Sequence, residues 1–217
     1  MTYSLFDQEE LTHPWNEALL PGAILLHRHA QHQAEALSAA IAHITAQAPW
    51  RQMHTPGGRR IQVHNSSCGS YGWVSDARGY RYENFDPLTG QAWPTMPPLF
   101  LELAAAAAAA AGYPDFVPDS CLINRYLRDT SLSLHQDKDE ADFQAPIVSI
   151  SLGMSANFVF GGLTRDAKLS RLLLEHGDVL VWGGAARLLY HGVQSLCGSA
   201  DPLLGEQRIN LTFRKAK

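Results

Sequence analysis

Two histidines and one aspartate in the C-terminal half of the sequence could hold a metal ion. His135 and Asp137 close the segment SLSLHQD, and His191 follows the apolar residues LLY. Because alternate residues of a strand point to one face, the side chains of His135 and Asp137 can point the same way, towards one metal ion. Two imidazoles and one carboxylate leave three positions open on iron, the facial arrangement of non-haem Fe(II) oxygenases. The spacing therefore predicts an iron site with room for O₂ and a co-substrate.

The HxD pattern alone is weak, because a chain with 10 histidines can show it by chance in a polar turn. His27, His29 and His32 form a competing histidine cluster. No carboxylate stands beside them in the sequence, and they lie just before a predicted helix. We interpret this second cluster as a solvated surface.

A second chemical pattern lies near the C-terminus, in the segment RINLTFR. Read as a strand, it carries polar side chains on one face at Arg208, Asn210, Thr212 and Arg214. Polar side chains inside a small barrel need partners, and the guanidinium fork of arginine binds carboxylates through paired hydrogen bonds. The pattern predicts a dicarboxylate site, to which Asn124 and Tyr126 of another strand could contribute. The alternative is an edge strand whose polar face meets water.

The elements that must position these residues are mostly short strands. From Asp119 onward, runs rich in Val, Ile, Leu and aromatic residues are separated by Gly, Asp, Pro or Ser. This pattern predicts a sandwich or barrel. Residues 33–48 and 101–111 have the composition and end signals of helices. We expect these helices to brace one sheet from outside, within a single domain that spans residues 1–217.

The bulk composition restricts the protein to a few broad classes. The 217 residues fit one domain with a full core, and the formal net charge of -4 gives no global sign of a nucleic-acid binder. Three widely spaced cysteines without a CxxC pair indicate a reduced intracellular chain with no disulfide. The N-terminus MTYSLFDQEE has no apolar signal core, and residues 101–111 are too short to span a bilayer. We expect a soluble cytoplasmic protein without a membrane partner.

Basic and aromatic residues are interleaved between positions 51 and 82. The basic residues are Arg51, Arg59, Arg60, Arg78 and Arg81, against one acid, Asp76. The aromatic residues are Tyr71, Trp73, Tyr80 and Tyr82. Such a mixture suits a single nucleic-acid strand, because arginines bind phosphates while rings stack on bases at roughly 1–3 kcal/mol per base. The alternative is a tyrosine-rich solvated loop.

Motifs along nearly the whole chain resemble the AlkB-type alkylation-repair dioxygenases, particularly their bacterial branch. In order, these motifs are RQMHTPGG, CGSYGW, YRYENFDP, AAAGYPDF, LINRY, SLHQDKDE, PIVSISLG, FGGL, RLLLEHGDVLVWGG and RINLTFR. The resemblance weakens only in the first dozen residues and at the extreme C-terminus. It implies a mainly β fold with flanking helices, in which a double-stranded β-helix (jelly-roll) core occupies about residues 119–214. A nucleotide-recognition lid precedes the core, at about residues 50–90.

The resemblance also implies roles for individual residues. Fe(II) would be bound by His135, Asp137 and His191. The co-substrate 2-oxoglutarate would be bound by Asn124, Tyr126, Arg208, Asn210 and Arg214, with Arg208 on the distal carboxylate and Arg214 near the carboxylate beside the metal. The base would lie near Trp73, Tyr80 and Asp139. Other substrate-proximal positions are Lys138, Tyr82, Thr55 and Arg165.

The activity implied by the resemblance is oxidative demethylation of 1-methyladenine and 3-methylcytosine in single-stranded DNA. It would consume O₂ and 2-oxoglutarate and release formaldehyde, succinate and CO₂, with the base flipped out of its stack. The carboxylate of Asp139 would favour these cationic lesions over neutral bases. Methylated RNA stays open as a substrate, because no residue must reject a 2′-hydroxyl. A protein substrate, or a non-catalytic sensor of metal or oxoacid, is a further alternative.

The sequence departs from the family pattern at three lid positions. Arg59 and Arg60 replace less basic residues after PGG, and Asn65 stands where a methionine lines the lid. We expect the two arginines to strengthen phosphate contacts and Asn65 to change the base preference. We expect the protein to act as a monomer.

Overall fold

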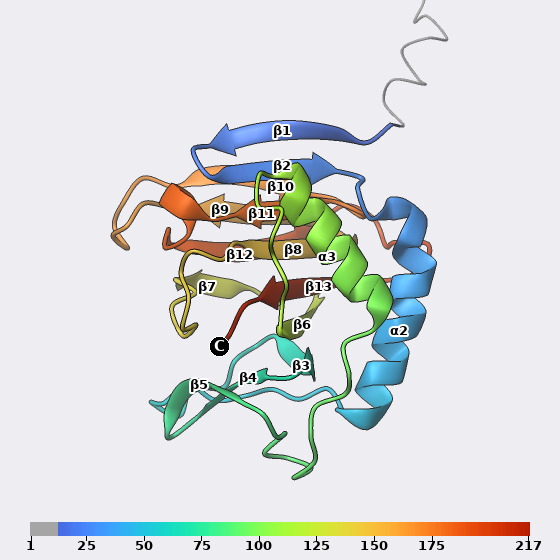
Figure 1. Ribbon diagram of the computed structural model, residues 1–217, viewed down its shortest axis with the longest axis vertical. Helices are drawn as coiled ribbons and strands as arrows, with labels where there is room; N and C mark the ends of the chain where they lie inside the picture. The colour runs from blue at the N-terminus through green and yellow to red at the C-terminus, as the bar shows by residue number, and fades with distance from the viewer. Residues whose placement is uncertain (1–12) are drawn as a thin grey trace, which may run out of the picture.

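The computed structural model describes residues 13–217, which form two main β-sheets (Figure 1). The major sheet contains, in spatial order, β1 (Trp15–Leu20), β2 (Ala23–His27), β11 (Val179–Trp182), β8 (Ile147–Gly153), β13 (Gln207–Arg214), β6 (Ser120–Leu127) and β3 (His64–Gly69). The minor sheet contains β10 (Ser170–Leu174), β9 (Ser155–Phe160), β12 (His191–Cys197) and β7 (Leu132–His135). Both sheets are antiparallel throughout, which confirms the expected mainly β fold.

Alternation along the strands divides the major sheet into an apolar outer face and a largely polar inner face. On β13, Ile209, Leu211 and Phe213 join the apolar cluster under the helices, while the residues between them face the minor sheet. The outer face is covered by α2 (Ala34–Gln47) and α3 (Pro98–Ala110), as Figure 1 shows. Phe100 of α3 meets Phe213 edge to face, with ring centroids 5.8 Å apart. Helix packing therefore fixes which face of β13 points inward.

A second apolar cluster lies between the two sheets. It joins Leu25 and Ile147 of the major sheet to Phe158 and Val193 of the minor sheet. Trp182 belongs to it and contacts His191, with ring centroids 5.2 Å apart. The apolar filling thus reaches directly to His191, one of the predicted iron ligands, which is itself buried.

The predicted helices are confirmed with shifted ends. The first begins as α2 at Ala34, after a 3₁₀ turn at Gln31–Gln33, and the second begins three residues earlier than expected, at Pro98. Proline suits the first helical position, because its missing N–H has no intrahelical acceptor there. The sequence interpretation missed β1 and β2, which precede the helices and extend the major sheet.

The segment expected to form the lid divides into two parts. Its strand β3 pairs with β6 and therefore belongs to the major sheet. Beyond it, β4 (Gly72–Asp76) and β5 (Gly79–Glu83) form a separate two-stranded hairpin. A Cβ at Gly72 would lie 2.3 Å from the Trp93 ring, so only glycine lets the hairpin pack this closely.

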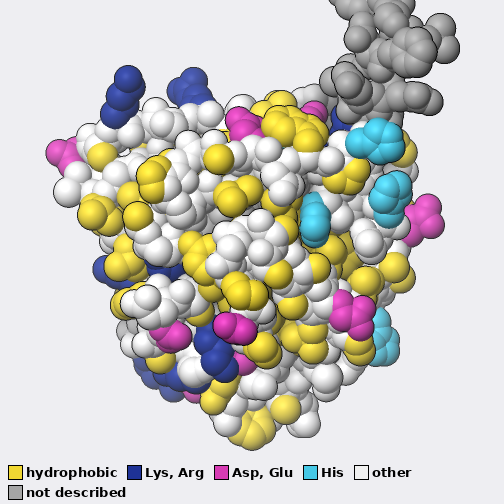
Figure 2. All heavy atoms as spheres, turned by 45° about the horizontal axis from the view of Figure 1, so that its top comes forward, with side chains coloured by type: hydrophobic (Ala, Val, Ile, Leu, Met, Phe, Trp, Pro, Cys, Tyr) yellow, Lys and Arg dark blue, Asp and Glu magenta, His cyan; other side chains and the backbone are white. Residues whose placement is uncertain are grey.

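The membrane, disulfide and surface expectations can be compared with the described residues. Within residues 13–217, no helix is long and apolar enough to cross a membrane. Cys68, Cys121 and Cys197 are free thiols. The expectation for the N-terminal segment MTYSLFDQEE lies outside the described residues. The face in Figure 2 intersperses hydrophobic and polar side chains, with lysine and arginine mostly at its margins.

Candidate iron and 2-oxoglutarate site

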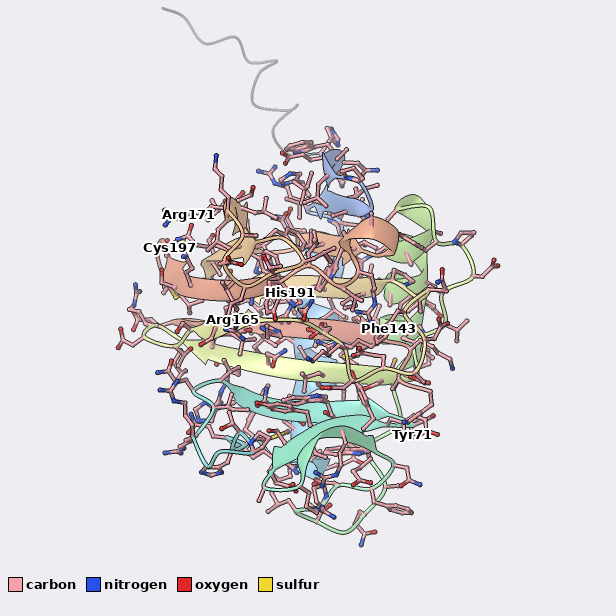
Figure 3. The ribbon with its side chains drawn as sticks, turned by 90° about the vertical axis from the view of Figure 1, so that its left-hand side faces the viewer. Tyr71, Phe143, Arg165, Arg171, His191 and Cys197 are labelled. Atoms are coloured by element: carbon pink, nitrogen blue, oxygen red, sulfur yellow. The ribbon has the colours of Figure 1, made fainter. Side chains whose placement is uncertain are left out.

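The predicted iron ligands come together at one end of the sandwich. Candidate ligand atoms of His135, Asp137 and His191 all lie within 4.8 Å of one another, and no other such cluster occurs within residues 13–217. His135 ends β7 and His191 begins β12, and the two are cross-strand partners. Asp137 follows β7 by two residues and completes the set. Figure 3 shows His191 near the centre of the molecule, well away from Arg171 and Cys197.

Both imidazoles are oriented by backbone carbonyls. Nδ1 of His135 donates to the Ser133 carbonyl at 2.9 Å, and Nδ1 of His191 donates to the Leu189 carbonyl at 3.0 Å. Because Nδ1 carries the proton in each ring, Nε2 keeps its lone pair free to bind a metal. Burial, with His135 nearby, lowers the pKa of His191 to about 4, so this ring stays neutral at physiological pH.

Asp137 is a buried carboxylate held by an arginine. Nε and Nη2 of Arg214 donate to its Oδ2 at 3.0 and 2.7 Å. Burial alone would raise the pKa of Asp137, but the charge of Arg214, with smaller contributions from His191 and His135, brings it well below its usual range. The three candidate ligands therefore offer two imidazole nitrogens and one anionic oxygen, a donor set that fits Fe(II).

The inner face of β13 fits the dicarboxylate expected there. Arg208 is buried, and its Nη2 donates to Ser151 Oγ at 2.9 Å. Its Nε and Nη1, with Nη1 of Arg214, have no hydrogen-bond partner among the described residues. Unpaired donors on buried cations are costly, so these atoms fit an anion between the arginines. Tyr126 completes this end, because its ring lies 5.1 Å from Arg208 Cζ.

The alternative of a solvated edge strand is wrong for β13. The strand lies between β8 and β6 inside the major sheet, and its polar inner residues are all buried. Thr212 donates to Asn210 Oδ1 at 2.7 Å, and Asn210 donates to Ser149 Oγ at the same distance. Asn124 of β6 adjoins this pair. The five predicted 2-oxoglutarate contacts therefore meet on one surface.

The predicted base-binding residues lie on the lid hairpin and beside the iron ligands. The Trp73 and Tyr80 rings stack with centroids 5.7 Å apart. Trp73 Nε1 donates to Asp139 Oδ2 at 2.8 Å, which joins the hairpin to the loop after Asp137. Arg165 lies over the ring of Tyr190, the residue before His191, with its Cζ 5.3 Å from the centroid.

The other three predicted substrate positions differ in their surroundings. Lys138 is exposed beside the iron ligands. Thr55 shapes a lid turn, because its hydroxyl accepts from the backbone N–H of Arg59 at 3.1 Å. Tyr82 is buried, and its hydroxyl donates to Glu140 at 2.6 Å, so it anchors the hairpin to the core.

Sequence reasoning missed Glu140 and Arg187, which contact Asp137 or its partner Arg214. Arg187 donates to the Asp137 carbonyl oxygen at 2.7 Å and to Glu140 Oε2 at 3.0 Å. Glu140 also lies 3.3 Å from Arg214 Nε. Two buried carboxylates and two buried arginines thus balance in charge. The acidic run DKDE after SLHQ was the only sequence signal, because nothing local pointed to Arg187 as a partner.

The lid arginines are less available than their number suggests. Arg51 forms an ion pair with Asp86, while Arg78 and Arg81 pair with Asp76. Arg81 also meets Glu83 at 2.6 Å. Three acids rather than one therefore neutralise this segment. Of the five lid arginines, only Arg59 and Arg60 are exposed and form no ion pair within residues 13–217.

We expected the competing cluster of His27, His29 and His32 to be a solvated surface, and this expectation is wrong for two of the three residues. His27 is half-buried, stacks on Trp15 with centroids 3.7 Å apart, and contacts Glu17 at 3.0 Å. Asp178, the residue before β11, lies 3.7 Å away, so carboxylates absent from the neighbouring sequence approach His27 from β1 and from the start of β11. His29 is also half-buried, and only His32 is exposed. The candidate metal groups within residues 13–217 nevertheless include only the three residues first identified.

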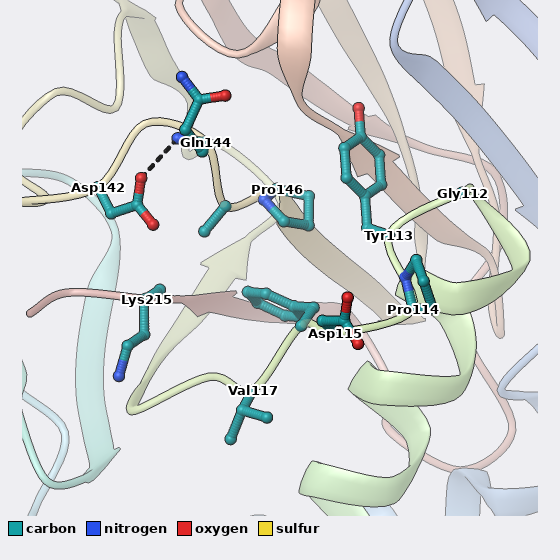
Figure 4. A pocket seen from close by; sticks show the side chains of 11 residues that line it. Gly112, Tyr113, Pro114, Asp115, Val117, Asp142, Gln144, Pro146 and Lys215 are labelled. Atoms are coloured by element: carbon teal, nitrogen blue, oxygen red, sulfur yellow. Dashed lines mark hydrogen bonds between the residues drawn. The ribbon is translucent and has the colours of Figure 1, made fainter.

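A hollow of about 440 Å³ lies outside this site (Figure 4). Tyr113, Val117, Pro146 and Lys215 contribute to its lining. None of the predicted iron, co-substrate or base contacts lines it. The chemistry therefore belongs to the space between the sheets.

Comparison with known proteins identifies relatives of this chain. The sequence model of the 2OG-Fe(II) oxygenase superfamily matches residues 22–214. The alpha-ketoglutarate-dependent dioxygenase AlkB of Escherichia coli is 55% identical over 203 residues, covering 94% of each chain. Human nucleic acid dioxygenase ALKBH1 is 33% identical over 57% of this chain and 29% of its own. The solved structure of OsALKBH1 has a TM-score of 0.82 at 29% identity, covering 93% of this chain and 100% of that chain.

The contacts of Arg187 generate a prediction for stability and metal binding. Arg187→Met should leave Glu140 buried without its closest cation and free the Asp137 backbone. Removing one partner of a buried pair costs about 3–5 kcal/mol. We expect urea unfolding to show a loss of that size, and Mn²⁺ titration to show weaker binding.

Arg171→Met is the matched control, because Arg171 is exposed on β10. Its unfolding free energy should change by no more than about 0.5 kcal/mol. An Arg187→Met protein as stable as this control would contradict the supporting role of Arg187.

Proposed function

Because the chain belongs to the 2OG-Fe(II) oxygenase superfamily, and within it to the AlkB-type dioxygenases, we propose that it demethylates N-alkylated bases in nucleic acid. One observation carries the chemistry: buried arginine donors without partners lie on the same strand face as the arginine that holds Asp137. An iron site and a dicarboxylate site therefore adjoin. This arrangement supports an active enzyme rather than a sensor.

The proposed roles of the iron-side residues follow from their contacts. When bound, Fe(II) and 2-oxoglutarate activate O₂ and oxidise the N-methyl carbon, which leaves as formaldehyde while succinate and CO₂ form. His135, Asp137 and His191 hold the metal, with both rings fixed by their Nδ1 hydrogen bonds. Arg214 keeps Asp137 ionised. The aromatic packing around His191 excludes water from that side.

The proposed co-substrate contacts divide between the two ends of 2-oxoglutarate. Arg208 and Tyr126 receive the distal carboxylate, since Arg208 offers two unpaired donors in a buried position. Arg214, Asn124 and Asn210 lie towards the metal and receive the other end. Arginines at both ends match the two negative charges of the ligand.

The lid supplies the proposed base contacts. Trp73 and Tyr80 present stacked rings that can pack on an extruded base. Asp139 commits Oδ2 to the Trp73 indole, and we assign its other oxygen to the base. Lys138, Tyr82, Thr55 and Arg165 surround or support this position. We propose single-stranded DNA as the preferred form, and a monomeric, cytoplasmic enzyme.

Substrate-dependent turnover tests the proposal. Purified protein with Fe(II), ascorbate and 2-oxoglutarate should form succinate and formaldehyde in equal amounts when given single-stranded DNA containing 1-methyladenine. An unmodified strand of the same sequence is the control, and the equivalent RNA tests the alternative substrate. Succinate formation that is equal for modified and unmodified strands would overturn the proposed substrate.

The carboxylate of Asp139 should select cationic lesions. Asp139→Asn keeps the side-chain shape and an acceptor for Trp73 but removes the charge. We expect kcat/KM for cationic 1-methyladenine to fall about ten-fold more than for neutral 1-methylguanine, because the lost attraction acts only on the charged base. Asp166→Asn, at an exposed position, is the control. An equal fall for both lesions would show that Asp139 does not act through charge.

The two unpaired lid arginines should contact phosphates. Arg59→Ala with Arg60→Ala should reduce the salt dependence of single-strand binding, with the slope of log K against log salt falling by about 0.7 per lost contact. Fluorescence anisotropy with a labelled oligonucleotide measures this slope. Arg128→Ala is the control, because Arg128 already pairs with Glu206. An unchanged slope in the double variant would exclude phosphate contacts by both arginines.

A further inference from the structure

Four polar side chains form a row across the inner face of the major sheet. Asn65 of β3 is the cross-strand partner of Asn124 on β6, which is the partner of Asn210 on β13. Asn210 is in turn the partner of Ser151 on β8. All four are buried. The row leads from the edge of the sheet, where the lid segment joins it, into the proposed 2-oxoglutarate site.

A backbone carbonyl fixes the direction of the hydrogen bonds in this row. Asn210 Nδ2 contacts the Ile150 carbonyl oxygen at 3.0 Å, and a carbonyl oxygen can only accept. Asn210 must therefore turn Oδ1 towards Asn124, so Asn124 presents its Nδ2 there, at 3.3 Å. The Oδ1 of Asn124 then points towards β3 and requires a donor. Asn65 Nδ2 supplies that donor at 2.6 Å.

We propose that Asn65 is a positioning residue for 2-oxoglutarate, acting through Asn124. This inference rests on the proposed function, which takes 2-oxoglutarate as the ligand and Asn124 as one of its contacts. A carboxylate accepts hydrogen bonds and cannot donate them, so it needs the Nδ2 end of Asn124. That end makes only long contacts, at 3.3 Å to Asn210 and 3.5 Å to Thr212, and is free to turn to a ligand.

Loss of the donor at position 65 has two possible consequences for Asn124, and both weaken the ligand contact. Its buried Oδ1 can stay without a partner, which disfavours the present side-chain orientation. Alternatively, the amide can flip, which turns Nδ2 away from the ligand and brings the Oδ1 atoms of Asn124 and Asn210 together. The short bond from Asn65 prevents both.

The surroundings of Asn65 separate this role from a purely structural one. Its own Oδ1 is buried and has no partner within residues 13–217. Replacing Asn65 by an apolar residue of similar size removes one unpaired buried oxygen, its own Oδ1, and leaves another, the Oδ1 of Asn124, so the fold should tolerate the change with little net loss of stability. The hydrogen bond of its side chain goes to Asn124, a proposed co-substrate contact, so we expect its main influence to fall on the co-substrate.

The decisive experiment measures co-substrate binding without turnover. In the Mn²⁺-loaded protein under nitrogen, Asn65→Leu should raise the Kd of 2-oxoglutarate about ten-fold, as expected for a disrupted buried hydrogen-bond pair. The Tm of the free protein should change little, because one unpaired buried oxygen replaces another. In turnover, KM for 2-oxoglutarate should rise while KM for the methylated oligonucleotide stays the same. Asn65→Val provides a second apolar variant if the leucine packs poorly.

Ser67→Ala is the matched control. Ser67 is buried two residues further along β3, and its Oγ also has no partner among the described residues. Its removal should leave 2-oxoglutarate binding unchanged. Side-chain amide NMR of the metal-free protein gives an independent readout, because the Asn124 NH₂ resonances should move in Asn65→Leu and not in Ser67→Ala.

The outcomes distinguish the inference from the proposed function. An unchanged Kd in both apolar variants would overturn the inference, as would a lower Tm with equal losses for co-substrate and oligonucleotide. The double variant that combines Asn65→Leu with Asn124→Leu should show non-additive losses of 2-oxoglutarate affinity. Additive losses would also count against the inference. A wild-type protein that binds 2-oxoglutarate but does not demethylate DNA would overturn the substrate proposal alone.

Discussion

The structure depends on keeping one buried carboxylate charged. Asp137 lies between Arg214 and two imidazoles, and its charge is what makes the three ligands suitable for Fe(II). An ion in this position is stable only if its partners are fixed. Arg187 and Glu140 fix them from behind, and Tyr82 ties the same cluster to the lid hairpin. Metal binding and lid placement therefore share one charge-balanced network.

The sandwich makes this network possible by separating apolar and polar packing. Helices α2 and α3 cover the apolar outer face of the major sheet, which leaves the inner face of β13 free to carry arginines and amides. The aromatic cluster around Trp182 and Phe158 then limits water at the iron end. A dry site strengthens the pull of each arginine on a dicarboxylate, because charges interact more strongly away from water. Stability and co-substrate binding thus use opposite faces of the same strands.

Side-chain hydrogen bonds connect the lid segment to the catalytic core. Trp73 reaches Asp139, Tyr82 reaches Glu140, and Asn65 reaches Asn124, each from the lid segment or its bordering strand. Each contact ends on a residue beside an iron ligand or on a proposed co-substrate contact. Changes in the lid sequence can therefore alter more than nucleic-acid binding.

The sequence by itself determined the iron ligands, the polar face of β13 and the mainly β fold, because residue type and strand alternation are local properties. His135, Asp137 and Arg208 were identified in this way. Only the tertiary structure decided which charges pair: Arg187 with Glu140, and Arg51 with Asp86. It also showed that Asn65, which we expected to change the base preference, donates a hydrogen bond to Asn124. These partners are far apart in sequence, so only the folded sheet brings them within hydrogen-bonding or ion-pairing distance.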